Sequence, residues 1–259
     1  ISFFAFDLID RVCSKTRALL KKLKYFWKMR DFAEEIFNNN KYDFVIVWNQ
    51  VTAFIFSDIL KKKFKGRYCI NIRDYHFDSI PIVRWRVGTA VKNAAFNTVS
   101  SEMFKKYLPK GDYLTVHSLN RSMLSKLKPK EKYKDKEEPI NILNIGQIRW
   151  YENIYPMIDE LANDPRYILT FVGQGAEKID EYVKGKNINN IVTHGRFNPE
   201  DTIKFLEDAD VIFNLYGVGN KHVDTALSIK LYYAIYLNIP ILTYEGTYIN
   251  KVAREVDIA

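Results

Sequence analysis

The C-terminal half of the sequence alternates short apolar runs with segments of helical periodicity, and this alternation restricts the possible fold more than any other feature. After the Ile- and Leu-rich run 140–145, apolar residues recur at helical spacing, at Ile154, Met157, Ile158 and Leu161. Further apolar runs follow at regular intervals, at 167–172, 191–194, 211–215 and 239–243. Such alternation of strands and helices predicts a parallel, doubly wound α/β sheet.

The first part of the chain shows a weaker version of the same pattern, with predicted strands at 44–48, 68–72, 97–100 and 114–116. Between the two parts, residues 126–138 contain ten charged residues in thirteen positions, which is typical of a solvated linker. We therefore expect an N-terminal α/β domain over 1–125, a charged linker over 126–138 and a second α/β domain over 139–259. The first domain begins with a helix and shows only about four strands, and the second stops inside a helical pattern, so we also expect a chain shortened at both ends.

The net charge of +8 comes from one stretch of the chain. Residues 11–30 hold eight basic residues and no acidic one, while the remaining 31 basic residues balance the 31 acidic ones. Within this stretch Leu19, Leu23 and Phe26 follow helical spacing, so a basic amphipathic helix is expected. Such a helix suits an anionic membrane surface, or it packs its apolar stripe on its own domain. Nucleic-acid binding is disfavoured, because no basic excess elsewhere follows a phosphate backbone.

Composition excludes several other classes. Two cysteines, Cys13 and Cys69, are too few for a disulfide scaffold, and the four histidines show no metal-ligand spacing, so we expect no metal and no cofactor. The longest uncharged runs, 44–57 and 231–244, are shorter than the roughly 20 residues of a membrane-spanning helix.

Glycines follow four successive predicted strands of the second domain. They are Gly146, then Gly173 and Gly175, then Gly195, then Gly217 and Gly219. In open α/β sheets ligands bind at the carboxyl ends of strands, where glycines let the backbone approach an anion and helix N-termini donate N–H groups. At any single position, a glycine that merely ends its strand is a sufficient explanation. The whole series, however, predicts a long ligand cleft that includes Gly146 and Gly173.

Several segments of the second domain together follow the pattern of a known family in their order and spacing. They are Asn144–Gly146, Leu169–Gly175, His194–Phe197, Ala209–Val211, Leu227–Tyr232 and Asn238–Leu242. In these segments the chain resembles the nucleotide-sugar-binding half of GT-B glycosyltransferases, in particular family-4 enzymes of capsule and exopolysaccharide assembly. Over residues 1–118 the resemblance is weaker and rests on Lys41–Ile46 and Ile72–Asp74. It implies two Rossmann-like domains facing a cleft, and transfer of a sugar from a nucleotide diphosphate to an acceptor hydroxyl without a metal.

The resemblance also implies roles for individual residues. Lys230, in a Leu-x-x-Lys context, is expected to meet the donor diphosphate, helped by Ser228 and by Arg149; an ordinary surface role remains open for Lys230 and Arg149. The base is expected against Arg196 and Phe197, although Phe197 is equally suited to act as a hydrophobic staple for the next helix.

One departure from the family pattern concerns the donor ribose. The family carries two Glu residues eight positions apart, and counting back from Pro240 places Thr225 and Tyr233 there. Neither is acidic, so Asp224 or the Tyr233 hydroxyl is expected to replace the lost contact. Loss of a charged hydrogen-bond partner costs about 1.5–3 kcal/mol, so donor binding would weaken rather than vanish. The alternative is an inactive, nucleotide-sugar-binding or assembly protein of the same fold.

On the acceptor side, Asp74 and His76 follow a predicted strand, and either is a candidate general base. The alternatives are a capping Asp and an exposed His, or a retaining enzyme that needs no such base. The resemblance thus implies a hexosyltransferase of surface-polysaccharide synthesis, with a glycan or lipid-linked acceptor. It would lie in the cytoplasm on the inner face of the plasma membrane.

Overall fold

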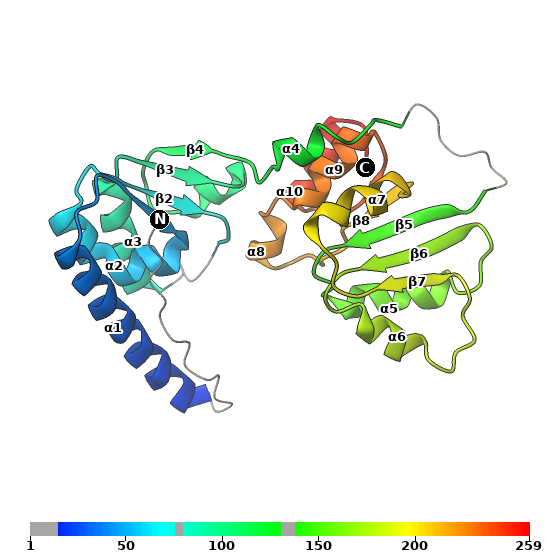
Figure 1. The fold of residues 1–259 in the computed structure, drawn as a ribbon, viewed down its shortest axis with the longest axis horizontal. Coiled ribbons are helices and arrows are strands. Elements are labelled where there is room, and N and C mark those ends of the chain that lie inside the picture. Colours follow the sequence, from blue (N-terminus) through cyan, green and yellow to red (C-terminus); the bar gives the residue numbers. More distant parts are fainter. Residues whose placement is uncertain (1–14, 76–79, 131–137) are drawn as a thin grey trace. The chain divides into compact units, whose positions relative to one another are not determined.

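The computed structural model describes residues 15–75, 80–130 and 138–259, with side chains from Lys24 onward. The chain divides into two compact units between Val116 and His117 (Figure 1). Each unit is built on its own parallel sheet, as the apolar pattern predicts, and each is described separately below.

The first unit has a four-stranded parallel sheet in the order β1-β2-β3-β4. Its strands are β1 (Val45–Trp48), β2 (Tyr68–Ile72), β3 (Phe96–Val99) and β4 (Tyr113–Thr115). The connections contain α2 (Asn49–Lys63), α3 (Pro81–Asn93) and the short 3₁₀ helix η1 (Glu102–Lys106). The strands lie where the sequence predicts them, but α3 was not predicted. It buries only Val87, Ala90 and Val91, which is too few apolar positions for a clear helical period.

The two faces of this sheet differ. Val47, Ile70, Ile72 and Val99 are buried on one face together with α2 and α3. The opposite face carries six exposed large apolar side chains, which are Phe44, Ile46, Trp48, Phe96, Leu114 and Val116. Parallel sheets are usually covered on both faces, so within the described residues only half of this sheet has the usual cover.

Ion pairs connect the long helix α1 (Lys15–Asn39) to the helices α2 and α3 of the first unit. Arg30 of α1 donates to Asp58 of α2 at 2.8 Å, and Arg86 of α3 donates to the other carboxylate oxygen at 3.1 Å. Partial burial acts to raise the pKa of Asp58, but the hydrogen bond from Arg30 and the two positive charges outweigh it. The pKa of Asp58 therefore lies below its ordinary value of 3.8.

An Asp58→Asn variant is expected to unfold more easily than the native chain by about 1 kcal/mol at pH 7, a value that allows for solvent screening. Since the folded pKa is depressed, this stabilisation is present above pH 3.8 and is lost as the pH falls through the folded pKa. Urea unfolding at pH 7 and at pH 3 measures the difference. Asp31→Asn is the control, because Asp31 is 72% exposed and lies 3.5 Å from Arg30. An equal deficit at both pH values would contradict the charge explanation.

The second unit has a five-stranded parallel sheet in the order β7-β6-β5-β8-β9. Its strands are β5 (Ile140–Ile145), β6 (Tyr167–Val172), β7 (Ile191–His194), β8 (Val211–Phe213) and β9 (Ile241–Leu242). Its helices are α4 (Arg121–Leu124), α5 (Tyr151–Glu160), α6 (Glu177–Val183), η2 (Pro199–Asp201), α7 (Thr202–Glu207), α8 (Lys221–Asp224), α9 (Ile229–Leu237) and α10 (Tyr248–Glu255).

Alternating strand residues build two cores, one on each face of this sheet. Leu143, Ile145 and Ile212 pack with α7, α9 and α10, while Ile142, Phe171 and Phe213 pack with α5 and α6. Burial of both faces explains why these strands read as nearly continuous apolar runs. The predicted doubly wound sheet is thus confirmed in this unit.

The boundary between the units lies earlier than residue 125. Residues from His117 onward belong to the second unit, where Leu124 and Leu127 are buried in the same core as residues of α9. Lys130 donates from its backbone to Leu237 and forms an ion pair with Asp210 at 3.1 Å. The start of the expected linker is therefore packed structure, while residues 131–137 lie outside the described chain. Because charged residues dominate 126–138, the sequence pattern does not show that Leu127, together with Leu124 just before this segment, is buried in the core.

Candidate functional site

The chain order of the second sheet reverses at β5, which pairs with β6 on one side and β8 on the other. Such a switch point separates the loops that leave the carboxyl ends of the two strands, and ligands bind in the crevice that results. The loop after β5 begins at Gly146 and the loop after β8 begins at Asn214 (Figure 1). Ligand-binding residues are therefore expected in these two loops and in the helices that follow them.

Lys230 reaches this switch point from the first turn of α9. Its ammonium donates to Asn144 Oδ1 of β5 at 2.5 Å and to the Phe213 carbonyl of β8 at 3.2 Å. Lys230 is 2% exposed, and its hydrogen-bond acceptors within the described chain include no carboxylate. Desolvation lowers its pKa, while the charge and hydrogen bonding of the Tyr216 hydroxyl act in the opposite direction. The centroid of the Tyr216 ring lies 5.1 Å from Nζ. The switch point thus holds a buried cation with only neutral partners.

A hollow of about 340 Å³ opens at the ends of β5, β6 and β7. It is lined by Gly146, Gln147, Gly173, Gln174, Arg196 and Phe197. A Cβ on Gly173 would lie 1.8 Å from the Gly146 carbonyl oxygen, so only glycine fits at this approach of two backbones. Four residues predicted for donor binding, Gly146, Gly173, Arg196 and Phe197, therefore come together here.

A second hollow of about 380 Å³ lies at the ends of β5, β8 and β9. Its lining includes Trp150, Glu152, Asn153, Tyr216, Asn220 and Tyr244. The Trp150 and Tyr216 rings are 6.5 Å apart, and the Tyr244 hydroxyl donates to Asn153 Oδ1 at 3.0 Å. Because Tyr216 also faces Lys230, the buried ammonium lies beside this hollow.

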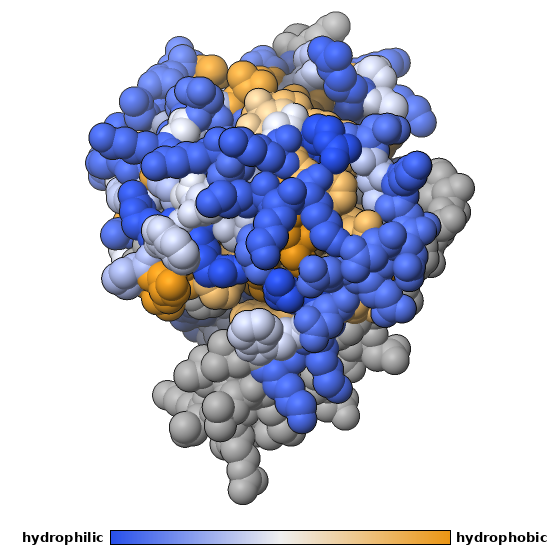
Figure 2. All heavy atoms as spheres, turned by 90° about the vertical axis from the view of Figure 1, so that its left-hand side faces the viewer, coloured by the Kyte–Doolittle hydropathy of each residue, from blue (hydrophilic) through white to orange (hydrophobic). Residues whose placement is uncertain are grey.

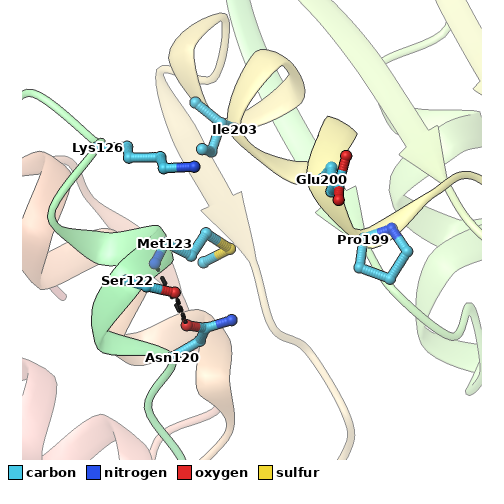
Figure 3. A pocket seen from close by; sticks show the side chains of 7 residues that line it. All are labelled: Asn120, Ser122, Met123, Lys126, Pro199, Glu200 and Ile203. Carbon is cyan, nitrogen blue, oxygen red and sulfur yellow. Dashed lines mark hydrogen bonds between the residues drawn. The ribbon is translucent and has the colours of Figure 1, made fainter.

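A third hollow, of about 430 Å³, lies between α4 and the η2–α7 segment. Figure 3 shows Asn120, Ser122, Met123 and Lys126 on one side, and Pro199, Glu200 and Ile203 on the other. Asn120 is occupied as the N-cap of α4, where it accepts from Ser122 and from the Met123 backbone. No lining side chain here is buried, so this hollow offers a ligand less than the switch point does.

The other residues predicted to bind the nucleotide-sugar donor lie at helix starts and in loops of the second unit. Ser228 is the N-cap of α9 and accepts from the Lys230 backbone at 3.3 Å. Asp224 accepts from the Gly219 backbone at 3.0 Å and so fixes the loop after β8. Arg149 is exposed on the loop after β5 and lines neither hollow at the switch point. Phe197 packs edge-on against Phe205 of α7 with ring centroids 5.4 Å apart, which agrees with a staple as well as with a base contact.

The two positions of the family's Glu residues are buried. Tyr233 is 8% exposed in the core around α9, and burial raises the pKa of its hydroxyl. Thr225 is 3% exposed and donates to the Lys221 carbonyl. Tyr233 lines neither hollow, so its position gives no support to a ribose contact through its hydroxyl.

Asp74 lies in the first unit, just beyond the end of β2. Its backbone N–H and that of Arg73 donate to Asn49 Oδ1, at 3.2 and 2.8 Å. Asn49 has a left-handed backbone, with a φ of 66°, at the end of β1. Asp74 is thus held at the carboxyl edge of its own sheet with an exposed carboxylate. His76 lies outside the described residues.

The sequence analysis missed the neutral groups that surround Lys230. Asn144 is an amide in an otherwise apolar strand, and this exception in the run 140–145 is the signal that points to it. Asn214, next to Phe213, is 3% exposed, and its Oδ1 has no hydrogen-bond partner among the described residues. Buried polar atoms are nearly always paired, so such an acceptor at a strand end is consistent with a ligand site.

Two features are absent from the described residues, a membrane-spanning helix and a cluster of metal ligands. Of the helices in 15–75, 80–130 and 138–259, none combines the length and the apolar character needed to cross a bilayer. In the same residues no three His, Cys, Asp or Glu side chains gather where they could hold a metal ion.

Comparison with solved structures identifies the fold. Sucrose-phosphate synthase from Thermosynechococcus elongatus superposes with a TM-score of 0.61 at 12% identity, over 85% of this chain and 60% of that one. The pneumococcal O-GlcNAc transferase GtfA, solved with UDP and GlcNAc, gives 0.52 at 11% identity, over 86% and 46%. A UDP-N-acetylglucosamine 2-epimerase from Rickettsia bellii gives 0.50 at 14%, over 90% and 69%.

The chain has a GT-B-like fold. It spans about 60% of the length of the synthase, and the identities are too low to show more than the fold. No protein-family model matches the sequence, and no curated protein matches it significantly. Function must therefore be argued from the site itself.

Proposed function

We propose that the second unit binds a nucleoside-diphosphate sugar, and that the protein transfers the glycosyl group to an acceptor hydroxyl. The observation that carries this proposal is the buried Lys230 ammonium at the switch point, which has only neutral partners. Burying a cation without an anion costs several kcal/mol, and natural chains keep such a cost where a ligand supplies the missing charge.

A diphosphate is the leaving group that matches this cation. Lys230 and the N-terminal N–H groups of α9 stabilise the negative charge that grows on the diphosphate as its bond to the sugar breaks. The base of the nucleotide lies in the hollow formed by Gly146, Gly173, Arg196 and Phe197. In this scheme the Lys230 side chain neutralises the charge of the diphosphate, as a metal ion does in other enzymes. Asp74 is the candidate general base for the acceptor hydroxyl.

Thermal unfolding with UDP, GDP, CMP and ADP tests this proposal, with a short oligonucleotide as the control polyanion. A ligand at 100 times its dissociation constant stabilises the folded state by about 2.7 kcal/mol. We expect a rise in unfolding temperature with one or more of these nucleotides and none with the oligonucleotide. If no nucleotide raises the unfolding temperature, the proposed donor site is wrong.

We propose further that the protein is a peripheral enzyme of the cytoplasmic membrane face, acting on a glycan or lipid-linked acceptor in surface-polysaccharide synthesis. The support is the basic segment 11–30, most of which lies in α1. In its described part, Lys24 and Lys28 are exposed on either side of Trp27, which is 63% exposed. Figure 2 shows a face of the molecule on which hydrophilic residues predominate, with separate hydrophobic patches between them.

A double variant Lys24→Glu/Lys28→Glu is expected to weaken binding to phosphatidylserine vesicles by at least roughly thirtyfold, because each basic residue near such a surface contributes about 1 kcal/mol. Vesicle co-sedimentation at low salt measures this change. The variant Lys61→Glu/Lys62→Glu carries the same change of charge on exposed residues of α2 and should bind like the native chain. Equal losses in the two variants, or equal binding to uncharged phosphatidylcholine vesicles, would exclude a specific membrane role for α1.

The alternative is a non-catalytic nucleotide-sugar-binding or assembly protein. It is favoured by the buried Thr225 and Tyr233, which stand where the family carries its two Glu residues. Slow hydrolysis of a bound donor without acceptor would argue against this alternative. Donor binding without hydrolysis, and without transfer to any lipid-linked or soluble glycan, would favour it.

A further inference from the structure

The hollow beside Lys230 has a chemistry of its own. Trp150, Tyr216 and Tyr244 supply aromatic rings, while Asn153, Asn220 and Glu152 supply amide and carboxylate groups. Its volume of about 380 Å³ falls within the usual range for small-molecule sites. Sugars present C–H groups on their faces and hydroxyls around their rims, so aromatic surfaces with a few polar groups suit them.

Two features fix the polar and aromatic groups in place. Trp150 has a left-handed backbone, with a φ of 65°, and its carbonyl accepts from the Asn153 backbone at 2.9 Å. Such strain in a non-glycine residue is typical of functional sites. The Tyr244 hydroxyl holds Asn153 Oδ1, which directs the amide Nδ2 toward Gly217, where a Cβ would lie 3.4 Å from it. Glycine at 217 therefore keeps space beside this donor.

The position of this hollow relative to Lys230 suggests what enters it. The Tyr216 ring contacts the ammonium and also lines the hollow, while the glycine-lined hollow opens at the ends of β6 and β7 on the other side of β5. A diphosphate at Lys230 therefore has the base site on one side and the aromatic hollow on the other. The glycosyl group is the part of the donor that remains for the aromatic hollow.

The charge of the lining restricts the sugar. Among the nine described residues that line this hollow, none is cationic, and Glu152 contributes a carboxylate. The Lys230 ammonium beside the hollow is occupied by the diphosphate in this scheme. A sugar with its own carboxylate would therefore meet repulsion from Glu152 without a positive partner of its own. We propose that this hollow receives the glycosyl group of the donor and that it selects an uncharged pyranose over a uronic acid. This inference rests on the proposed function, since it takes the diphosphate to lie at Lys230.

Calorimetry tests this inference by comparing the dissociation constant of each free nucleoside diphosphate with those of its sugar nucleotides. Two series are used, UDP with UDP-glucose and UDP-glucuronic acid, and GDP with GDP-mannose and GDP-mannuronic acid. In the series that binds, we expect the neutral sugar nucleotide to bind at least about tenfold more tightly than the uronic acid form. Trp150→Gly removes the ring and tolerates the left-handed backbone. It should weaken the neutral sugar nucleotide about five- to tenfold and change the dissociation constant of the free diphosphate less than twofold.

Two further variants complete the experiment. Glu152→Gln should improve binding of the uronic acid nucleotide and leave that of the neutral one unchanged. Trp27→Ala removes an exposed Trp of the first unit and should alter neither. The inference is overturned if the diphosphates bind but the neutral and acidic sugars bind alike, or if Trp150→Gly weakens diphosphate and sugar nucleotide equally. Absence of all binding by the native chain would instead overturn the proposed function.

Discussion

A Lys230→Met variant is expected to lose nucleoside-diphosphate binding and yet unfold at a temperature no lower than that of the native chain. A hydrogen bond between charged groups, such as that from Lys230 to the diphosphate, contributes about 1.5–3 kcal/mol. Loss of this bond should therefore weaken nucleotide binding roughly 10- to 150-fold. Met fills a similar volume without a buried charge. Relief from burying the ammonium offsets the loss of its bonds to Asn144 and the Phe213 carbonyl.

The pH dependence of stability gives an independent check on this lysine. Burial lowers the pKa of Lys230 below its ordinary value of 10.5, so between the two values the unfolded chain binds more protons. The native chain should therefore gain stability as the pH rises through that window, and Lys230→Met should show less of this gain. A bound diphosphate favours the charged lysine, so nucleotide binding should weaken over the same rise in pH.

Lys251→Met is the control for both measurements. Lys251 lies on α10 of the same unit with a side chain that is 65% exposed, so its removal should change neither binding nor the pH profile. If Lys230→Met binds nucleotides like the native chain, the diphosphate does not lie at Lys230. If Lys230→Met is strongly destabilised, the ammonium is a structural group and the argument from uncompensated charge fails.

A Gly173→Ala variant is expected to lose at least about 3 kcal/mol of unfolding free energy, which is a large effect for a single methyl group. The added Cβ would lie 1.8 Å from the Gly146 oxygen and 2.8 Å from its carbonyl carbon, and both are backbone atoms of the neighbouring loop. The backbone φ of 129° is also unfavourable for alanine. Relief of these contacts requires the loops after β5 and β6 to separate, so nucleotide binding should weaken as well.

Gly195→Ala provides a matched comparison at the end of the adjacent strand β7. The Cβ position of Gly195 has open space around it, and its φ is outside the left-handed range, so stability should change by less than about 0.5 kcal/mol. Chemical unfolding and calorimetry with the nucleotide that binds measure both variants. If Gly173→Ala behaves like Gly195→Ala, the close approach of the two loops does not shape the site.

Prediction from the sequence succeeded where one physical signal dominates. The strands of the second sheet were predicted because burial on both faces makes each of them an apolar run, as in 140–145 and 167–172. It failed for α3 and for the boundary at 125. The helix α3 buries few residues, and two leucines anchor a segment that otherwise appears solvated. Charge density along the sequence does not reveal that Leu124 and Leu127 reach a core whose other members lie between Leu143 and Ile258.

Lys230 was singled out through the family resemblance, and its role stays a prediction. The sequence by itself determined the two parallel α/β units and the glycine series at the strand ends. These features depend on local patterns, because strand burial, left-handed turns and helix starts each restrict the residue types at nearby positions. Tertiary structure alone decided that Lys230 is buried between Asn144 and the Phe213 carbonyl, that Tyr233 belongs to the core and that Trp150, Tyr216 and Tyr244 share one hollow. The partners of Lys230 lie 86 and 17 residues away, and only the order of strands in the sheet brings them together.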